Sequence, residues 1–337
     1  MLGHNLRLRT MKRLSLCVTF ILACLAVRSA RADETVPARL AGVQRIVFLG
    51  DSITYAGGYV DYIEAVVRTR GPGWRGEMLD LGLPSETVSG LSEPGHAGGK
   101  FPRPVLRERL DRVLAQTQPD LVIACYGIND GIYFPYSDER FAKFQAGLEH
   151  LRARAAAAHA SVMLVTPPVF DPRPIPDKIR PAELAADPKK MFAGYNGVLD
   201  RYSAWLIAQR ADGWVVIDAH GPMNAALATR RQAEPDFTFA KDGVHPTASG
   251  HALIAQAILA AWGCSAADAA LPLSLATAPE SELLKLIRTR RKLLSDAWLT
   301  ATGHLRPGMT AGRPLAEAVA EAAKLETQIR QEPAGAR

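Results

Sequence analysis

The chain of 337 residues is 48% hydrophobic and 22% charged, which is typical of a globular protein with ample material for a core. Its formal net charge of +6 arises from the first 32 residues, which hold six basic residues and no acidic one. Without those six, the basic residues equal the 34 acidic ones, so the composition excludes the charge pattern of a nucleic-acid-binding protein.

Residues 1–32 have the pattern of a secretory signal peptide. Lys12 and Arg13 precede the apolar run Leu14–Val27, which is short for a membrane span. The small-x-small sequence Ala30–Ala32 then offers a cleavage site. We therefore expect a secreted or periplasmic protein that begins near Asp33 and has no stable membrane insertion. An uncleaved anchor helix is the alternative.

Apolar runs and segments of helical spacing alternate along residues 45–262. The runs predict strands at 45–50, 77–82, 120–127, 161–166 and 214–219. Helices are predicted between or after them, at 59–70, 104–117, 139–160, 191–210 and 248–262. Most runs are continuously apolar, as in strands that are buried on both faces. The alternation predicts an α/β fold whose parallel sheet carries helices on both faces and a site at the strands' C-terminal edge.

The pattern changes after this sheet domain, which we place at residues 33–263. Residues 264–279 are predicted to be a linker, and 280–299 and 313–331 to be amphipathic helices. These helices would pack on the sheet domain or form the contact of a homo-oligomer. The alternative is that Trp298, His304 or Arg306 joins the site.

Two cysteines, Cys125 and Cys264, remain after the expected cleavage. Their spacing neither requires nor excludes a disulfide, and no Cys/His cluster has zinc-site spacing.

Ser52 stands in FLGDSIT, between the first predicted strand and a helix. A serine there is either a helix cap or a nucleophile, and a nucleophile needs a base. Asp242 and His245 lie three residues apart in KDGVHP, close enough for the carboxylate to orient the imidazole. Asn129 in YGIND ends the third strand, where its amide could donate to an oxyanion or form a turn.

Together, FLGDSIT, LDLGLPSET, YGIND and DGVHP resemble the sequence blocks of the SGNH (GDSL-type) hydrolase superfamily over residues 45–262. The resemblance implies a three-layer α/β/α sandwich with a five-stranded parallel sheet, a flavodoxin-like SGNH fold. It implies Ser52 as nucleophile, His245 as general base and Asp242 as its partner. The oxyanion would be bound by Asn129 and the backbone N–H groups of Ser52 and Ser85, with no metal or organic cofactor.

The second block departs from the family pattern, because Ser85 replaces the glycine that supplies an oxyanion N–H. Ser85 can replace it only if it adopts the required backbone conformation, and Gly82 is the alternative donor. Asp51, Gly82 and Tyr133 are further candidates for the substrate rim.

The long loops 83–104 and 167–190 leave the predicted active edge and are expected to form substrate rims. Rim segments carry polar and aromatic side chains, which suit sugars better than a long acyl chain: His96, Arg103, Tyr133, Tyr136, Asp171 and Arg173. We therefore predict a secreted esterase that acts on a small-molecule or glycan ester, most consistently a carbohydrate O-acetyl group. The alternatives are a lysophospholipase or short-chain carboxylesterase, and a catalytically inactive glycan-binding module.

Overall fold

The structure, a computed structural model, describes residues 38–71, 73–180 and 190–332. Residues Glu34–Arg337 cluster into one compact unit that contains every described element. The predicted signal peptide, 1–32, lies outside the described residues.

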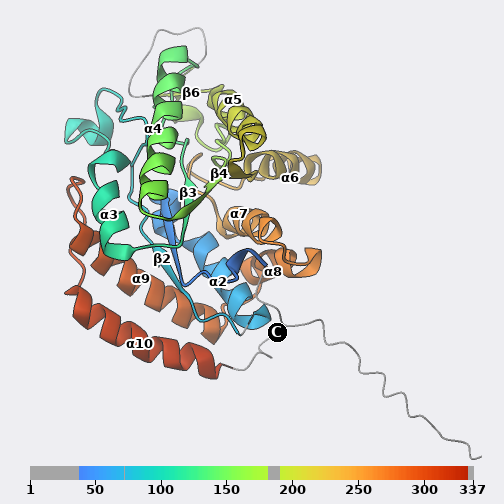
Figure 1. Cartoon of the computed structure of the whole chain (residues 1–337). Helices are drawn as coiled ribbons and strands as arrows, with labels where there is room; N and C mark the ends of the chain where they lie inside the picture. The colour runs from blue at the N-terminus through green and yellow to red at the C-terminus, as the bar shows by residue number, and fades with distance from the viewer. Residues whose placement is uncertain (1–37, 72, 181–189, 333–337) are drawn as a thin grey trace, which may run out of the picture. The chain divides into compact units, whose positions relative to one another are not determined.

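A five-stranded parallel sheet forms the centre of this unit (Figure 1). Its order is β2-β1-β3-β4-β7, and the strands are β1 (Arg45–Gly50), β2 (Glu77–Asp80), β3 (Leu121–Cys125), β4 (Ser161–Val165) and β7 (Val215–Ile217). Every strand coincides with a predicted apolar run, which confirms the fold class. All five strands are parallel, so their C-terminal ends meet at one edge.

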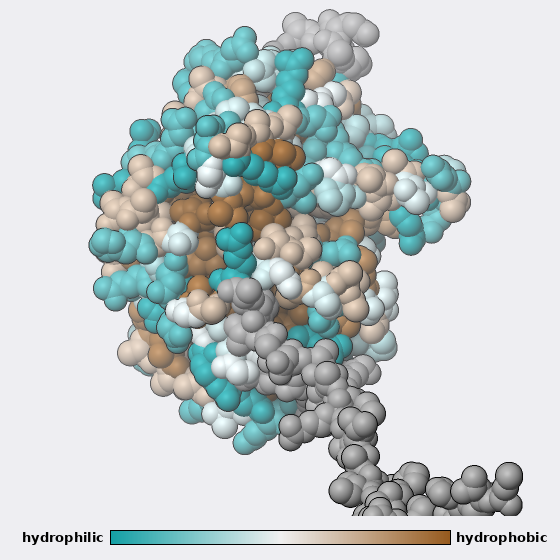
Figure 2. Space-filling view, turned by 45° about the vertical axis from the view of Figure 1, so that its right-hand side comes forward, coloured by the Kyte–Doolittle hydropathy of each residue, from teal (hydrophilic) through white to brown (hydrophobic). Residues whose placement is uncertain are grey.

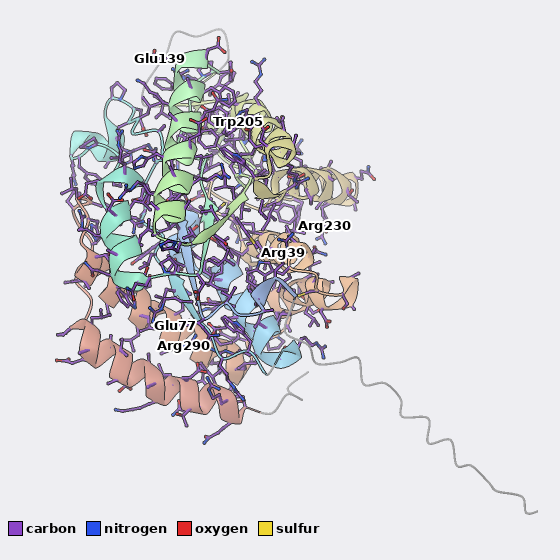
Figure 3. The ribbon with its side chains drawn as sticks, viewed as in Figure 1. Arg39, Glu77, Glu139, Trp205, Arg230 and Arg290 are labelled. Carbon is purple, nitrogen blue, oxygen red and sulfur yellow. The ribbon has the colours of Figure 1, made fainter. Side chains whose placement is uncertain are left out.

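Helices cover both faces of the sheet. On one face α2 (Gly58–Arg70) packs against α7 (Ala248–Ala261), and on the other α3 (Leu110–Thr117) packs against α4 (Asp138–Ala157). Trp205 of α5 (Tyr195–Ala208), labelled in Figure 3, meets Phe141 of α4 edge to face at 5.9 Å between ring centroids. The large apolar side chains of the central strands, such as Val47, Ile123 and Leu164, are buried between these layers, and each contributes about 1.5–3 kcal/mol of hydrophobic stabilisation.

The remaining elements are shorter or were not predicted. Helix α6 (His220–Ala233) has no counterpart in the sequence prediction, and neither has the two-stranded parallel sheet of β5 (Ile179–Arg180) and β6 (Met191–Phe192). The short helices are α1 (Ser52–Ala56) and the 3-10 turns η1 (Ala38–Leu40), η2 (His96–Gly99), η3 (Leu106–Glu108), η4 (Pro176–Lys178) and η5 (Gln209–Asp212).

The predicted linker at 264–279 is wrong, because most of it forms helix α8 (Ala266–Thr277). Ser265 caps this helix by accepting the N–H of Asp268 and donating its own hydroxyl to that carboxylate. Pro272 lies inside the helix, and its typical role as a helix breaker explains the incorrect prediction.

The two predicted C-terminal helices are confirmed as α9 (Glu282–Thr302) and α10 (Leu315–Gln331), which pack against each other. Helix α9 also contacts α2 and β2. Arg290 of α9, which Figure 3 shows near Glu77 of β2, is buried and forms ion pairs with Glu64 and Glu326. The C-terminal helices therefore pack on the sheet domain.

Figure 2 shows one face of the molecule, on which hydrophobic residues gather near the middle and hydrophilic residues surround them. In the part of the chain that the structure covers, no helix is both long and apolar enough to cross a bilayer.

Candidate active site

Ser52 lies directly after β1, at the first position of helix α1. The capping role belongs to its neighbour Asp51, whose Oδ1 accepts the N–H of Ile53 at 2.8 Å. The hydroxyl of Ser52 is therefore free for another partner, and it lies 2.7 Å from Nε2 of His245. The prediction of Asp51 as a rim residue is wrong, because Asp51 is buried beneath the helix and does not line the pocket.

His245 and Asp242 share the turn that precedes α7. Nδ1 of His245 lies 2.6 Å from Oδ2 of Asp242, while Oδ1 of Asp242 accepts the backbone N–H groups of Val244 and His245. Partial burial would raise the pKa of Asp242, but these hydrogen bonds hold it below its ordinary value. The ionised carboxylate thus fixes the ring with Nε2 facing Ser52.

The turn itself is held from the loop after β4. Asp171 donates its backbone N–H to the carbonyl of Gly243, and its carboxylate accepts from Arg231 and Thr238. The sequence placed Asp171 on the substrate rim, but its side chain is buried and supports the turn that carries Asp242 and His245.

Ser85 has a backbone φ of 71°, in the left-handed region that glycine occupies at little cost. It therefore adopts the conformation available to the glycine that it replaces. Gly82 is excluded as the donor, because its N–H donates to Oδ1 of Asp80 at 3.0 Å. Ser85 lines the pocket beside Ser52, and no hydrogen bond within the described ranges uses the backbone N–H of either residue.

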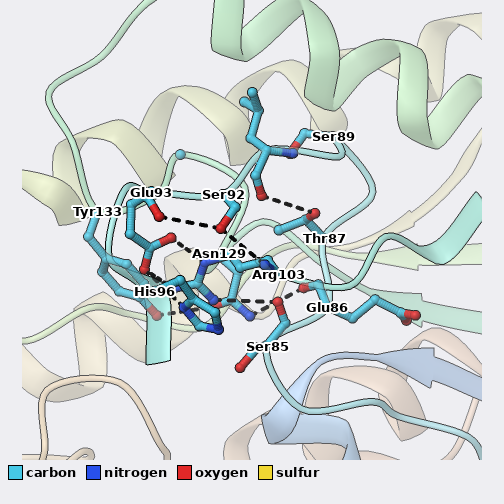
Figure 4. Close-up of polar contacts among 12 residues, drawn as sticks. Ser85, Glu86, Thr87, Ser89, Ser92, Glu93, His96, Arg103, Asn129 and Tyr133 are labelled. Carbon is cyan, nitrogen blue, oxygen red and sulfur yellow. Dashed lines mark hydrogen bonds and ion pairs between the residues drawn. The ribbon is translucent and has the colours of Figure 1, made fainter. Parts of the chain in front are cut away.

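The amide of Asn129, at the end of β3, is oriented from both sides. Nδ2 donates to the carbonyl of Glu86 at 3.2 Å, and Oδ1 accepts the hydroxyl of Tyr133 at 3.0 Å. Both contacts are drawn in the close-up of Figure 4. The second hydrogen of Nδ2 remains for the pocket, which Asn129 lines. Tyr133, predicted as a rim residue, lines the pocket and also orients this amide.

Buried ion pairs fix the loop that carries Ser85. The carboxylate of Glu86 accepts two bonds of 2.7 Å from Arg109 and one of 2.6 Å from the hydroxyl of Tyr126. Arg103 forms a bidentate pair with Glu93 and donates to the carbonyl of Ser85 at 3.4 Å (Figure 4). Burial alone would raise the pKa of Glu93, but bonds from His96 and Arg103 lower it to about 2.

The serine, histidine and aspartate border one pocket of about 420 Å³. Of the candidate rim residues from the sequence, His96, Arg103 and Tyr133 line it, whereas Tyr136 and Arg173 do not. Arg306, from the segment after α9, lines the pocket; Trp298 and His304 do not.

Sequence reasoning missed several lining residues: Glu93, Ile132, Phe134, Lys178, Lys190 and Met191. Glu93, Lys178 and Lys190 lie in the long loops expected to form rims, and Met191 follows the second of them, so these segments were indicated but not the individual side chains. Ile132 and Phe134 lie beside Tyr133 in the segment between β3 and α4. Cys125 and Cys264 are both free. Across the described ranges, no group of three or more His, Cys, Asp or Glu side chains could hold a metal ion.

A doubly wound α/β sheet that carries hydrogen-bonded serine, histidine and aspartate side chains at the C-terminal edge of its strands defines the class of a hydrolase. The sequence profile of the GDSL-like lipase/acylhydrolase family matches residues 48–253. The chain therefore belongs to this family, and it is an ester hydrolase.

The solved structures that match this chain are only distantly similar in sequence. A gut microbial diltiazem-metabolizing enzyme, BT4096, is 21% identical with a TM-score of 0.51; the match covers 65% of this chain and 47% of that enzyme. The chain thus spans about half the length of that enzyme. Axe2, an acetylxylan esterase from Geobacillus stearothermophilus, is 22% identical with a TM-score of 0.47, covering 66% of this chain and 95% of Axe2. No curated protein matches the sequence.

Proposed function

We propose that Ser52, His245 and Asp242 hydrolyse a carboxylic ester through an acyl-enzyme, and that the ester is an O-acetyl group on a carbohydrate. The observation that carries the catalytic part is the continuous chain of hydrogen bonds from Ser52 Oγ to His245 and on to Asp242, at the wall of an open pocket.

The first half of the reaction forms the acyl-enzyme. Ser52 Oγ attacks the ester carbonyl as His245 Nε2 takes its proton, and the carboxylate of Asp242 stabilises the resulting imidazolium. The N–H groups of Ser52 and Ser85 and the amide of Asn129 stabilise the oxyanion. His245 then returns the proton to the leaving alcohol oxygen as the tetrahedral intermediate collapses.

The second half regenerates the enzyme with water. His245 removes a proton from a water molecule, the hydroxide attacks the acyl carbonyl, and the same donors stabilise the second oxyanion. Collapse releases the carboxylic acid and returns the proton to Ser52. The side chains of Asp242 and His245 are about half exposed, so water reaches the base without a rearrangement.

The composition of the pocket supports a sugar as the alcohol part of the ester. Most of the residues that line it are polar or charged, among them Glu93, His96, Arg103 and Arg306. Phe134, which is half-buried, adds aromatic surface to this lining. A long acyl chain would instead require a continuous apolar channel.

Acetate release from O-acetylated oligosaccharides, measured beside nitrophenyl esters of increasing acyl length, tests this proposal. We expect acetate from the oligosaccharides and a preference for the shortest nitrophenyl ester. Ser52→Ala should lower kcat at least about 10³-fold. A preference for long acyl chains, or turnover of lysophospholipids but not acetylated sugars, would contradict the carbohydrate assignment.

Export is a second part of the proposal. A carbohydrate esterase would meet polymeric glycans outside the cytoplasm, and the apolar run Leu14–Val27 followed by Ala30–Ala32 supports cleavage before Asp33. N-terminal sequencing of the protein recovered from its native compartment should give a start near Asp33. A start that retains the apolar run would contradict cleavage.

A further inference from the structure

The active-site pocket is lined by more basic than acidic side chains. Four lining side chains are basic, Arg103, Lys178, Lys190 and Arg306, and two are acidic, Glu93 and Asp242. Both acidic side chains already have partners within the site. Glu93 is bound to Arg103, and Asp242 is bound to His245.

Three of the basic side chains therefore remain without a carboxylate partner among the residues that the structure describes. Arg306 donates Nε to the carbonyl of Pro84 at 2.9 Å and Nη1 to that of Pro307 at 3.1 Å, and its guanidinium lies 5.5 Å from the ring centroid of Phe101. These contacts hold a half-buried cation against the pocket. Nη2 donates to no other described side chain or carbonyl, so it is available to a ligand.

Lys178 and Lys190 line the pocket from the positions just before the two strands of the small second sheet. Its strands pair Ile179 with Met191 and Arg180 with Phe192 in parallel, so the same register brings Lys178 opposite Lys190. Two like charges that line one pocket repel each other. Both lysines line the same pocket as Ser52 and His245, so an anion there would remove this repulsion.

We propose that the ester substrate carries a carboxylate, as in an O-acetylated uronic-acid glycan, and that Arg306, Lys178 and Lys190 bind that carboxylate. Arg306 suits this ligand because its guanidinium stays charged and its unused Nη2 group can still donate to a carboxylate oxygen. The inference rests on the proposed function, since it assigns the charge of the same carbohydrate substrate. The polar lining favours an acidic sugar over an anionic lysophospholipid.

The test compares two substrates that differ only in the group at C6: an O-acetylated oligogalacturonide, which carries carboxylates, and its carboxyl-reduced, neutral counterpart, which carries hydroxymethyl groups. The wild-type protein should favour the acidic substrate in kcat/KM by about tenfold or more, chiefly through a lower KM, because a charged hydrogen bond is worth about that factor. Arg306→Gln and the double variant Lys178→Gln/Lys190→Gln should each lower this preference about tenfold.

Lys324→Gln provides a matched control, because Lys324 is an exposed lysine of α10 outside the pocket. It should keep the wild-type preference and rate. Added salt should weaken the preference for the acidic substrate.

Equal kcat/KM for the acidic and neutral sugars, or a preference that survives all three substitutions, would overturn this inference and leave the esterase proposal intact. Faster hydrolysis of lysophospholipids than of either sugar would overturn it as well. If nitrophenyl acetate is hydrolysed but neither acetylated sugar is, the carbohydrate proposal itself falls, and this inference falls with it.

Discussion

Asp51 and Ser52, the two residues after β1, have different roles. A polar side chain is needed there to cap α1, and a free hydroxyl is needed for reaction with an ester. Asp51 caps the helix through Ile53, and Ser52 contacts His245. A lone serine in this position could be either a helix cap or a nucleophile. Here Asp51 accepts the free N–H of the helix, so Ser52 is left for the reaction.

Asp51 should make stability depend on pH. Burial, opposed by the N–H of Ile53 and reinforced by the charge of Asp130, raises its pKa from 3.8 to about 7. A raised folded-state pKa gives stability that is complete below about pH 4 and is lost as pH rises through about 7. Asp51→Asn keeps the acceptor but cannot ionise. Its free energy of unfolding relative to wild type should therefore increase from pH 4 to pH 8, by up to about 4 kcal/mol.

Urea unfolding of both proteins at pH 4, 6 and 8 measures this difference. The exposed Asp236→Asn controls for the same chemical change at the surface. A difference between Asp51→Asn and wild type that stays constant over this range would show that the carboxyl does not titrate as expected.

Ser85 carries backbone strain beside the site. A side chain at φ 71° costs about 1–2 kcal/mol, and Ser85→Gly would remove that cost while losing about 0.5–1 kcal/mol through a more flexible unfolded chain. We expect Ser85→Gly to raise the free energy of unfolding by a few tenths to about 1 kcal/mol, and to keep activity because the donor is a backbone N–H.

Thermal unfolding and kcat of Ser85→Gly check this expectation. Ser161→Gly, at an exposed strand position without positive φ, should instead lower stability. Destabilisation at both positions would mean that Ser85 is not strained.

At the scale of elements, helix α9 contacts the segments that position Ser52 and Ser85. Arg291 of α9 binds Asp61 of α2 and Asp80 of β2, and donates to the carbonyl of Ala56 at the end of α1. Its guanidinium fills the space beside Gly57, where φ is 75° and a Cβ would overlap it. Asp80 in turn accepts the N–H of Gly82. The extension thus reaches the loop of Ser85 through buried polar contacts.

Arg291→Met should therefore destabilise the protein by about 3–5 kcal/mol, because it leaves the buried carboxylate of Asp80 without its cationic partner and that of Asp61 with Arg288 alone. The neighbouring Lys292, which is 64% exposed and pairs with Asp296 on the surface, offers a matched control. Lys292→Met should change stability by less than about 1 kcal/mol. Similar values for the two variants in urea unfolding would show that the buried network contributes little.

The elements that could be predicted from the sequence are those with a clear hydrophobic pattern. The buried runs around Val47, Ile123 and Leu164 predicted three strands of the sheet, and the helical spacing of α4 and α9 was clear. Helix α8 was missed because Pro272 indicated a break in the helix, although Ser265 is a typical N-cap residue. Lys178 and Lys190 were missed because the two-residue strands that they precede leave no periodic signal.

At the scale of the whole molecule, the catalytic residues and the C-terminal helices belong to one compact unit, although the family profile ends at residue 253. The motifs located Ser52 and Asn129, which follow β1 and β3 of one parallel sheet, and the Asp242–His245 turn, which lies between α6 and α7. Arg306 could only be named as one of three candidates. Its position depends on the packing of α9 on β2, a long-range contact that no local pattern encodes.

The central claim is that His245 activates Ser52 across 193 residues of sequence, and covalent labelling tests it most directly. A fluorophosphonate probe, followed by peptide mapping, should place one adduct on Ser52 in the wild-type protein. Folded Ser52→Ala should give no adduct, and His245→Ala should label at least about 10³-fold more slowly. An adduct on another serine, or undiminished labelling of Ser52 without His245, would contradict the account.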